Sequence, residues 1–253
     1  AAFVIITVLN DMDTELSPNE PSGSGTAATD TADIKPSSKG SPYKFYFERL
    51  TPVEKRAYNA IIEKIYDMPE RIAVPKIDGK ELDNVFSALL FDNPDLFFLG
   101  RKCAVETRMW STYFSVDYII DKADLADMKA QLERECETFE QTLTDPDNQW
   151  RTELEIHDYV IDKCEYHDPE GDLVYSSSYG ALVNGQAACE GYSKAAKLLL
   201  DRAGIENALI SGISENGEGS GGAHMWNIVN IGGDYYHLDC TWDDPVSDDG
   251  GKL

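Results

Sequence analysis

The sequence predicts an α+β fold, because segments of two different hydrophobic periods succeed one another along the chain. Apolar residues recur at helical spacing in most of residues 51–164 and again in 191–203. Three segments rich in β-forming residues then follow, at 206–213, 223–231 and 234–241. We therefore expect N-terminal helices packed with a C-terminal antiparallel sheet.

The predicted elements before residue 180 are mainly helical. Thr51-Pro52 is a helix start, and Asp92-Asn93-Pro94 is a stop. The run Leu96–Leu99 is apolar and is expected to be buried core. Helices are predicted at 53–66, 81–91, 122–143 and 153–164, and one strand at 110–120.

The first 42 residues differ in composition from the rest of the chain. Residues 1–9 are apolar, and residues 10–42 contain many Ser, Thr, Gly, Pro and Asp residues with almost no large apolar side chains. We interpret 1–42 as an apolar start, from a signal or anchor segment or else a short strand, followed by a flexible linker. This arrangement predicts a folded domain at 43–253 that is extracellular or tethered to the cell surface.

The charge balance excludes some partners. The chain has 46 acidic and 22 basic residues, for a formal net charge of −24. Such a charge argues against nucleic acid or an anionic membrane as partner. It is compatible with an extracellular or a cytosolic protein, and it would attract a basic peptide or an amine.

The cysteines do not form a metal-binding pattern. Five are present, with no C-x-x-C pair, so the count fits one free thiol with up to two disulfides, or five reduced thiols. Cys164 and His167 have the spacing of half a zinc site, and a metal-dependent hydrolase using His157, Cys164 and His167 is a rival interpretation. A closed zinc site needs four ligands. We therefore expect no metal and no other cofactor.

Cys189 lies where a nucleophilic thiol would be expected. Residues 191–203 have helical spacing, and Gly204 supplies a C-terminal stop, so the helix begins close to Cys189. At a helix N-terminus the unpaired N–H groups and the helix dipole favour the thiolate. The same N–H groups are suited to stabilise an oxyanion.

The last two predicted strands bring a histidine close to a carboxylate. Gly232-Gly233 is a two-residue hairpin signal. With this loop Trp226 lies opposite Asp239, so His224 and Asp239 are diagonal neighbours on one sheet face, with Cβ atoms roughly 5–8 Å apart. A longer loop or a bulge would place them on opposite faces.

These residues are the parts of a Cys–His–Asp triad. The base takes the thiol proton, and the carboxylate fixes the imidazole tautomer. The alternative for Cys189 is a small buried hydrophobic residue, and for His224 a structural hydrogen bond. The residues alone leave both interpretations open.

Several short motifs together resemble the bacterial transglutaminase-like superfamily. They occur in the family's order over roughly residues 150–245, and they read Tyr179-Gly180-Ala181-Leu182, Gly185, Cys189-Glu190-Gly191-Tyr192-Ser193, His224-Met225-Trp226-Asn227, Tyr236-His237-Leu238-Asp239 and Thr241-Trp242-Asp243-Asp244-Pro245. Met225 departs from the family, where alanine is commoner. The resemblance implies a papain-like core with Cys189 as nucleophile, His224 as base and Asp239 as its orienter. Family members continue with further strands, so the chain is expected to be truncated at its C-terminus or to have an incomplete sheet.

Three further residues are candidates for the same site. Gln186 is suited to donate to an oxyanion beside the Cys189 N–H, with a solvent-exposed loop residue as the alternative. Trp226 and Trp242 are expected as hydrophobic walls of the cleft. The Gly-rich segment 214–222 is predicted to be a mobile loop beside the site.

The sequence therefore predicts acyl transfer on an amide. A peptide, protein or cell-wall peptide is the expected substrate, with hydrolysis favoured over transfer to an amine. The alternative is a non-catalytic extracellular module that binds a peptide or glycan on the same fold. The oligomeric state is left open.

Overall fold

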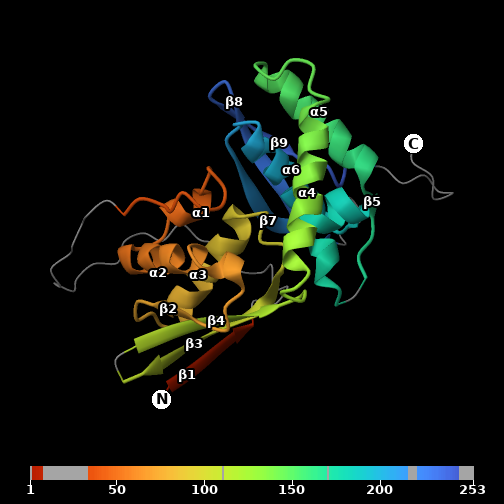
Figure 1. Ribbon diagram of the computed structural model, residues 1–253. Coiled ribbons are helices and arrows are strands. Elements are labelled where there is room, and N and C mark those ends of the chain that lie inside the picture. The colour runs from red at the N-terminus through yellow and green to blue at the C-terminus, as the bar shows by residue number, and fades with distance from the viewer. Residues whose placement is uncertain (1, 8–33, 110, 170, 216–220, 245–253) are drawn as a thin grey trace.

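A computed structural model of the protein describes residues 2–7, 34–109, 111–169, 171–215 and 221–244. It confirms the α+β class, with helices and antiparallel sheets in one chain. The four-stranded sheet lies at one end of the molecule in Figure 1 and α5 lies toward the other, with α4 running between them. Helix α6 and a three-stranded sheet lie between α5 and the N-terminal helices.

Three α-helices form the N-terminal part of the described chain, and the second and third begin at residues whose side chains cap them. They are α1 (Phe45–Glu48), α2 (Pro52–Ile62) and α3 (Gly79–Asp92). Thr51 and Glu54 form a capping box at α2, and Asp78 and Glu81 form one at α3. Each box satisfies N–H groups that have no partner within the helix. The 3-10 helix η1 (Ile65–Asp67) follows α2.

The sheet at the end of the molecule has the strand order β1-β3-β4-β2, with antiparallel neighbours. Its strands are β1 (Ala2–Thr7), β2 (Ile72–Val74), β3 (Leu99–Arg108) and β4 (Ser111–Tyr118). Strand β4 was predicted from the sequence, whereas β2 and β3 were not. Ala2–Thr7 form the short strand that was the alternative for the apolar start, and a signal or anchor origin of this segment stays a prediction.

Part of the predicted linker contacts the helices. The Ser37 N–H donates to Asn59 Oδ1 at 2.9 Å, and the Ser41 N–H donates to Asn93 Oδ1 at 3.2 Å. Ordered contacts therefore begin before Tyr43, within residues 34–42. Residues 8–33, the rest of that segment, lie outside the described residues.

Helix α4 (Leu125–Glu140) runs through the middle of the molecule, and α5 (Gln149–Lys163) lies at the other end. Helix α5 begins earlier than predicted, because the Asn148 side chain caps it by accepting from the Arg151 N–H. Helix α6 (Cys189–Arg202) ends as predicted at Gly204, which has a φ of 71°. The Ile205 N–H donates to Leu200 O at 2.9 Å, which completes a Schellman motif.

Short elements connect α5 to α6. These are β5 (Glu165–Tyr166), η2 (Leu173–Ser176), the π-helical turn η3 (Gly180–Asn184) and β6 (Gln186–Ala187), with β5 and β6 paired in parallel. Gly191 allows the first turn of α6 to lie against η2. A Cβ at Gly191 would lie 2.6 Å from Tyr175 O and 2.6 Å from Ala187 Cβ.

The C-terminal sheet has the order β7-β8-β9 and is antiparallel throughout. Its strands are β7 (Asn207–Glu215), β8 (Gly221–Ile231) and β9 (Asp234–Leu238). The prediction of a loop over 214–222 is wrong at both ends, because Ser214 pairs with Gly222 and Glu215 with Gly221. Residues 216–220 lie outside the described residues.

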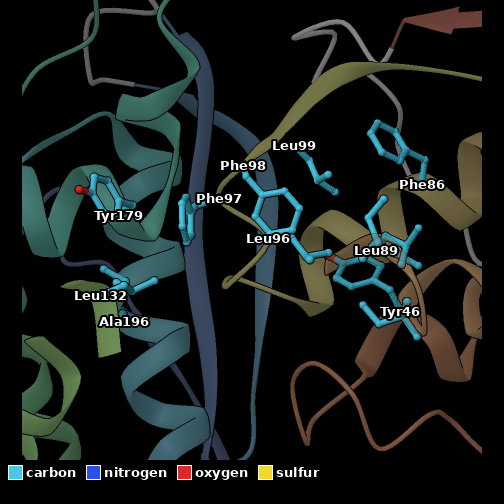
Figure 2. Packing of buried hydrophobic residues seen from close by; sticks show 14 of the residues in the cluster. Tyr46, Phe86, Leu89, Leu96, Phe97, Phe98, Leu99, Leu132, Tyr179 and Ala196 are labelled. Atoms are coloured by element: carbon cyan, nitrogen blue, oxygen red, sulfur yellow. The ribbon is translucent and has the colours of Figure 1, made fainter. Parts of the chain in front are cut away.

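One hydrophobic cluster extends from Tyr46 to Cys240. Leu96–Leu99 are buried in it, as predicted. Phe97 stacks on Tyr179 of the α5–α6 connection (Figure 2), with ring centroids 5.1 Å apart. The neighbouring Phe98 contacts Tyr66 and Tyr118. The N-terminal helices and the region around α6 therefore share a core. In the described part of the chain, no helix is long and apolar enough to cross a membrane.

Candidate active site

Cys189 is the first residue of α6, as its sequence position predicts. It is partly exposed, whereas the other four cysteines are buried, and none of these five described cysteines is joined in a disulfide. Because Cys189 opens the helix, its N–H has no acceptor within the helix. The thiol therefore lies at the positive end of the helix dipole and is accessible to solvent.

The hairpin has the predicted register. Gly232 and Gly233 form its turn with φ of 65° and 98°, Ile231 pairs with Asp234, and Asn227 pairs with Leu238. This register places His224 and Asp239 on the same side of the sheet. The distance from His224 Nε2 to Asp239 Oδ2 is 2.7 Å.

Asp239 is oriented by the turn that follows it. Its Oδ1 accepts from the N–H groups of Thr241 at 3.2 Å and Trp242 at 3.1 Å. The Tyr192 hydroxyl of α6 donates to the buried Asp244 Oδ2 at 2.7 Å. The turn is therefore attached to the helix that carries Cys189, and Oδ2 of Asp239 remains directed at the imidazole.

His224 contacts both Cys189 and Asp239. Burial would lower the pKa of His224, but hydrogen bonds to Asp239 and Cys189 and their charges outweigh it and raise the pKa to about 9. Because Nε2 is bonded to Asp239, Nδ1 is the nitrogen left to face the thiol. The imidazole is therefore cationic at neutral pH, and a cation beside a thiol favours the thiolate.

Hydrogen bonds fix α6 against the strand that carries His224. The Ser193 hydroxyl, one turn after Cys189, contacts Cys189 O and Met225 O, each at 2.8 Å. The Asn227 side chain donates to Ser193 O at 3.0 Å. All these groups except the partly exposed thiol are buried. The relative position of Cys189 and His224 is thus set by a rigid helix–strand contact.

Two indole rings lie against His224. The Trp226 ring is stacked with a centroid distance of 5.9 Å, and the Trp242 ring with one of 5.0 Å. Trp242 is 59% exposed. The structure therefore places both predicted wall residues beside the candidate base, where they provide apolar surface.

The orientation of Trp226 depends on a glycine. Its indole N–H donates to His237 Nδ1 at 2.8 Å, and its ring lies over Gly212 of β7. A Cβ at Gly212 would lie 2.8 Å from Trp226 Cη2, which is too close for the present ring position. Neither Gly212 nor a role for His237 in the motif Tyr236–Asp239 was predicted from the sequence.

We predict that Gly212→Ala changes substrate binding more than the chemical step. The added methyl group would push the Trp226 ring off β7. Gly212 pairs with His224, and Trp226 stacks on His224, but the hydrogen bond from His224 to Asp239 does not involve β7. The expected result is a KM raised about three- to tenfold, comparable with the loss of one apolar contact, and a kcat changed less than twofold. Steady-state kinetics check this, with Gly222→Ala as control because a Cβ there would meet nothing within 4 Å. An unchanged KM would contradict a contact between Trp226 and the substrate.

Tyr166 is a residue near the nucleophile that the sequence analysis missed. It is 49% exposed on β5. Burial first, then the charges of Cys189 and Asp168, raise the pKa of its hydroxyl. Only the β5–β6 pairing brings Tyr166 to Cys189. Gln186 lies half-exposed in the adjacent strand β6, and its role toward an oxyanion stays a prediction.

The residues of the rival metal site have other contacts. His157 Nδ1 lies 2.9 Å from Asp158 Oδ1 and Nε2 lies 3.3 Å from Asp243 Oδ2. His167 packs against the Tyr175 ring, and Cys164 Sγ contacts Glu165 O. Within the described residues, no three His, Cys, Asp or Glu side chains are grouped so as to hold a metal ion.

The solved structures most similar to the chain are distant from it. A structure described as a TGase is 14% identical, with a TM-score of 0.39, and the match covers 73% of this chain and 58% of that one. A candidate cysteine protease from Cytophaga hutchinsonii is 15% identical with a TM-score of 0.36, and the match covers 52% of this chain and 51% of that one. The periplasmic domain of TgpA from Pseudomonas aeruginosa is 14% identical with a TM-score of 0.34, and the match covers 52% of this chain and 54% of that one. The chain thus spans little more than half the length of these proteins. No curated protein matches it.

The family match covers the candidate site. Residues 137–240 match the model of the transglutaminase-like superfamily. This segment contains α5, the connection to α6, α6 itself and the C-terminal sheet. It includes Cys189, His224 and Asp239 and all the motifs quoted from the sequence except Thr241–Pro245, which follows the segment. Residues 137–240, which are less than half of the chain, are therefore similar to domains of the transglutaminase-like superfamily.

Proposed function

We propose that the protein catalyses cysteine-dependent acyl transfer on amides, with Cys189 as nucleophile, His224 as general acid and base, and Asp239 as the group that orients His224. The observation that supports this most is the continuous contact from Cys189 to His224 to Asp239, at the N-terminus of α6. The superfamily is generally one of cysteine-dependent enzymes, which agrees with this assignment.

The proposed reaction follows from these contacts. The Cys189 thiolate attacks the amide carbonyl, and the developing oxyanion accepts from the Cys189 N–H and from Gln186. The C–N bond then breaks as the His224 imidazolium donates its proton to the leaving nitrogen, which gives a thioester. Water or an amine attacks the thioester while His224 accepts its proton, and the C–S bond breaks to release the acyl product and restore the Cys189 thiolate beside the imidazolium.

A peptide or protein is the proposed substrate, as for the superfamily in general. Trp242 and Tyr166 present exposed aromatic surface beside the site, which suits an extended peptide better than a small charged molecule. We favour hydrolysis of a peptide or cell-wall amide over transglutamination. An extracellular or cell-surface location, with residues 43–253 as the folded domain, completes the proposal and rests on the composition of residues 1–42.

A binding module on the same fold is the second candidate. The observation in its favour is the exposed aromatic surface near the site, which would hold a peptide or glycan without any reaction. The contact between Cys189 and His224 has no role in such a module. We therefore rank it below the enzyme.

Alkylation near pH 6 tests the proposed thiolate without a known substrate. Brief treatment with limiting iodoacetamide, followed by intact mass and peptide mapping, should label Cys189 alone. An ordinary thiol, with a pKa of about 8.5, hardly reacts at this pH. The labelling should be lost in His224→Ala. If Cys189 reacts no faster than a thiol in the urea-unfolded chain, the proposed ion pair does not form.

A further inference from the structure

A cluster of three charged side chains includes the residue that follows the nucleophile at the start of α6. Glu190, the residue after Cys189, is 9% exposed, and one of its carboxylate oxygens, Oε1, lies 2.7 Å from Lys194 Nζ. Its other oxygen, Oε2, contacts the guanidinium of Arg101. Arg101 comes from β3 and therefore from outside residues 137–240.

The side chains of the cluster are mostly shielded from solvent. The side chains of Lys194 and Glu190 are 11% and 12% exposed, and that of Arg101 is 24% exposed. A cavity of about 20 Å³ adjoins them, lined also by Leu96, Phe97 and Leu173. This volume holds about one water molecule. Charges here are therefore screened less than at the surface.

The net charge of Glu190, Lys194 and Arg101 determines whether the cluster stabilises or destabilises a thiolate at Cys189. Burial would raise the pKa of Glu190, but Lys194 and Arg101 outweigh it and lower the pKa, so the carboxylate is ionised. An unpaired carboxylate next to Cys189 would repel a thiolate. Lys194 alone would leave the cluster neutral, whereas Lys194 and Arg101 together give it one net positive charge.

We propose that Arg101 is a positioning residue for the nucleophile, because it holds Glu190 from β3 and leaves a net positive charge beside the Cys189 thiolate. This inference rests on the proposed function of Cys189. It makes the N-terminal sheet part of the active unit, although that sheet lies outside the family segment. Arg101 itself does not touch the substrate in this role.

The test compares rates of iodoacetamide labelling of Cys189 at pH 6 in the full chain. Arg101→Met should lower the rate about tenfold, since one unit charge is lost at close range in a poorly solvated site. Glu190→Gln should raise it, because this variant removes the negative charge and keeps the shape. Arg101→Lys should restore most of the rate, because it keeps the positive charge.

Arg108→Met is the matched control. Arg108 lies on the same strand and pairs with Glu106 at 2.8 Å, but its side chain is 57% exposed. Its removal should leave the labelling rate unchanged. Thermal melting of each variant shows whether the fold persists, and the rates are compared only among folded variants.

Two results would overturn the inference while leaving the proposed function intact. One is a rate in Arg101→Met equal to that of Arg108→Met. The other is a fall of similar size in both Arg101→Met and Glu190→Gln, which would indicate that the cluster only supports the helix. If wild-type Cys189 itself shows no selective labelling, the proposed function fails first.

Discussion

Cys189→Ala should abolish amide turnover and leave the fold unchanged. The thiol is partly exposed at the start of α6, so its loss creates no buried cavity. Removing the nucleophile of a triad lowers kcat by about 10³- to 10⁶-fold, because the remaining groups act only as a unit with it. The measurements are release of amine from a labelled protein such as casein, transfer of a fluorescent amine to a glutamine peptide, and the melting temperature.

Cys136→Ala is the control for loss of a thiol elsewhere. Cys136 is buried in α4 and has no contact with the candidate site among those described. This variant should lose about 1 kcal/mol of stability through the small cavity and keep its turnover. Equal turnover in Cys189→Ala and Cys136→Ala would contradict the role of Cys189.

The same variant separates the enzyme from the binding module. In an enzyme, Cys189→Ala still binds the substrate peptide but no longer converts it. In a binding module, neither protein converts any peptide, and both bind it with the same Kd. Measuring both turnover and Kd on one peptide therefore distinguishes the two proposals.

The hairpin with His224 could be predicted from the sequence because its register is a local property. A two-residue turn at Gly232-Gly233 determines every pair along β8 and β9. The start of α6 was predictable for a similar reason, since its helical pattern and Gly204 lie within a few residues of each other. Local patterns of this kind give the three candidate triad residues and their secondary structure.

Contacts between distant segments could not be predicted in this way. Strand β3 includes Arg101, Lys102 and Glu106 among its apolar residues, so its alternation is weak, and it forms through pairing with β1 and β4. The contact of Arg101 with Glu190 joins residues 89 positions apart. Tyr166 reaches Cys189 only through the parallel pairing of β5 with β6. Each of these depends on tertiary packing.

Asp239→Asn should lower kcat, and its kcat/KM should begin to decline at a lower pH than that of the wild type. The pKa of His224 is raised to about 9, so the imidazolium is present below about pH 9 and is lost above it. Because the imidazolium donates the proton to the leaving nitrogen, wild-type kcat/KM should decline as pH rises through 9. An amide at position 239 removes the negative charge that raises this pKa, so the decline should begin nearer pH 7. The loss of orientation should also lower kcat by about 10²- to 10⁴-fold.

Asp243→Asn is the matched control for this change. Asp243 lies in the same turn, its side chain is 61% exposed, and it contacts His157 rather than His224. Its pH profile and kcat should resemble those of the wild type. A pH profile of Asp239→Asn that is merely lowered, with its decline still near pH 9, would show that Asp239 does not control the charge of His224. Both variants lose one negative charge from the same turn. If the decline of kcat/KM moves to lower pH only in Asp239→Asn, the hydrogen bond between Asp239 and His224 is what keeps His224 protonated.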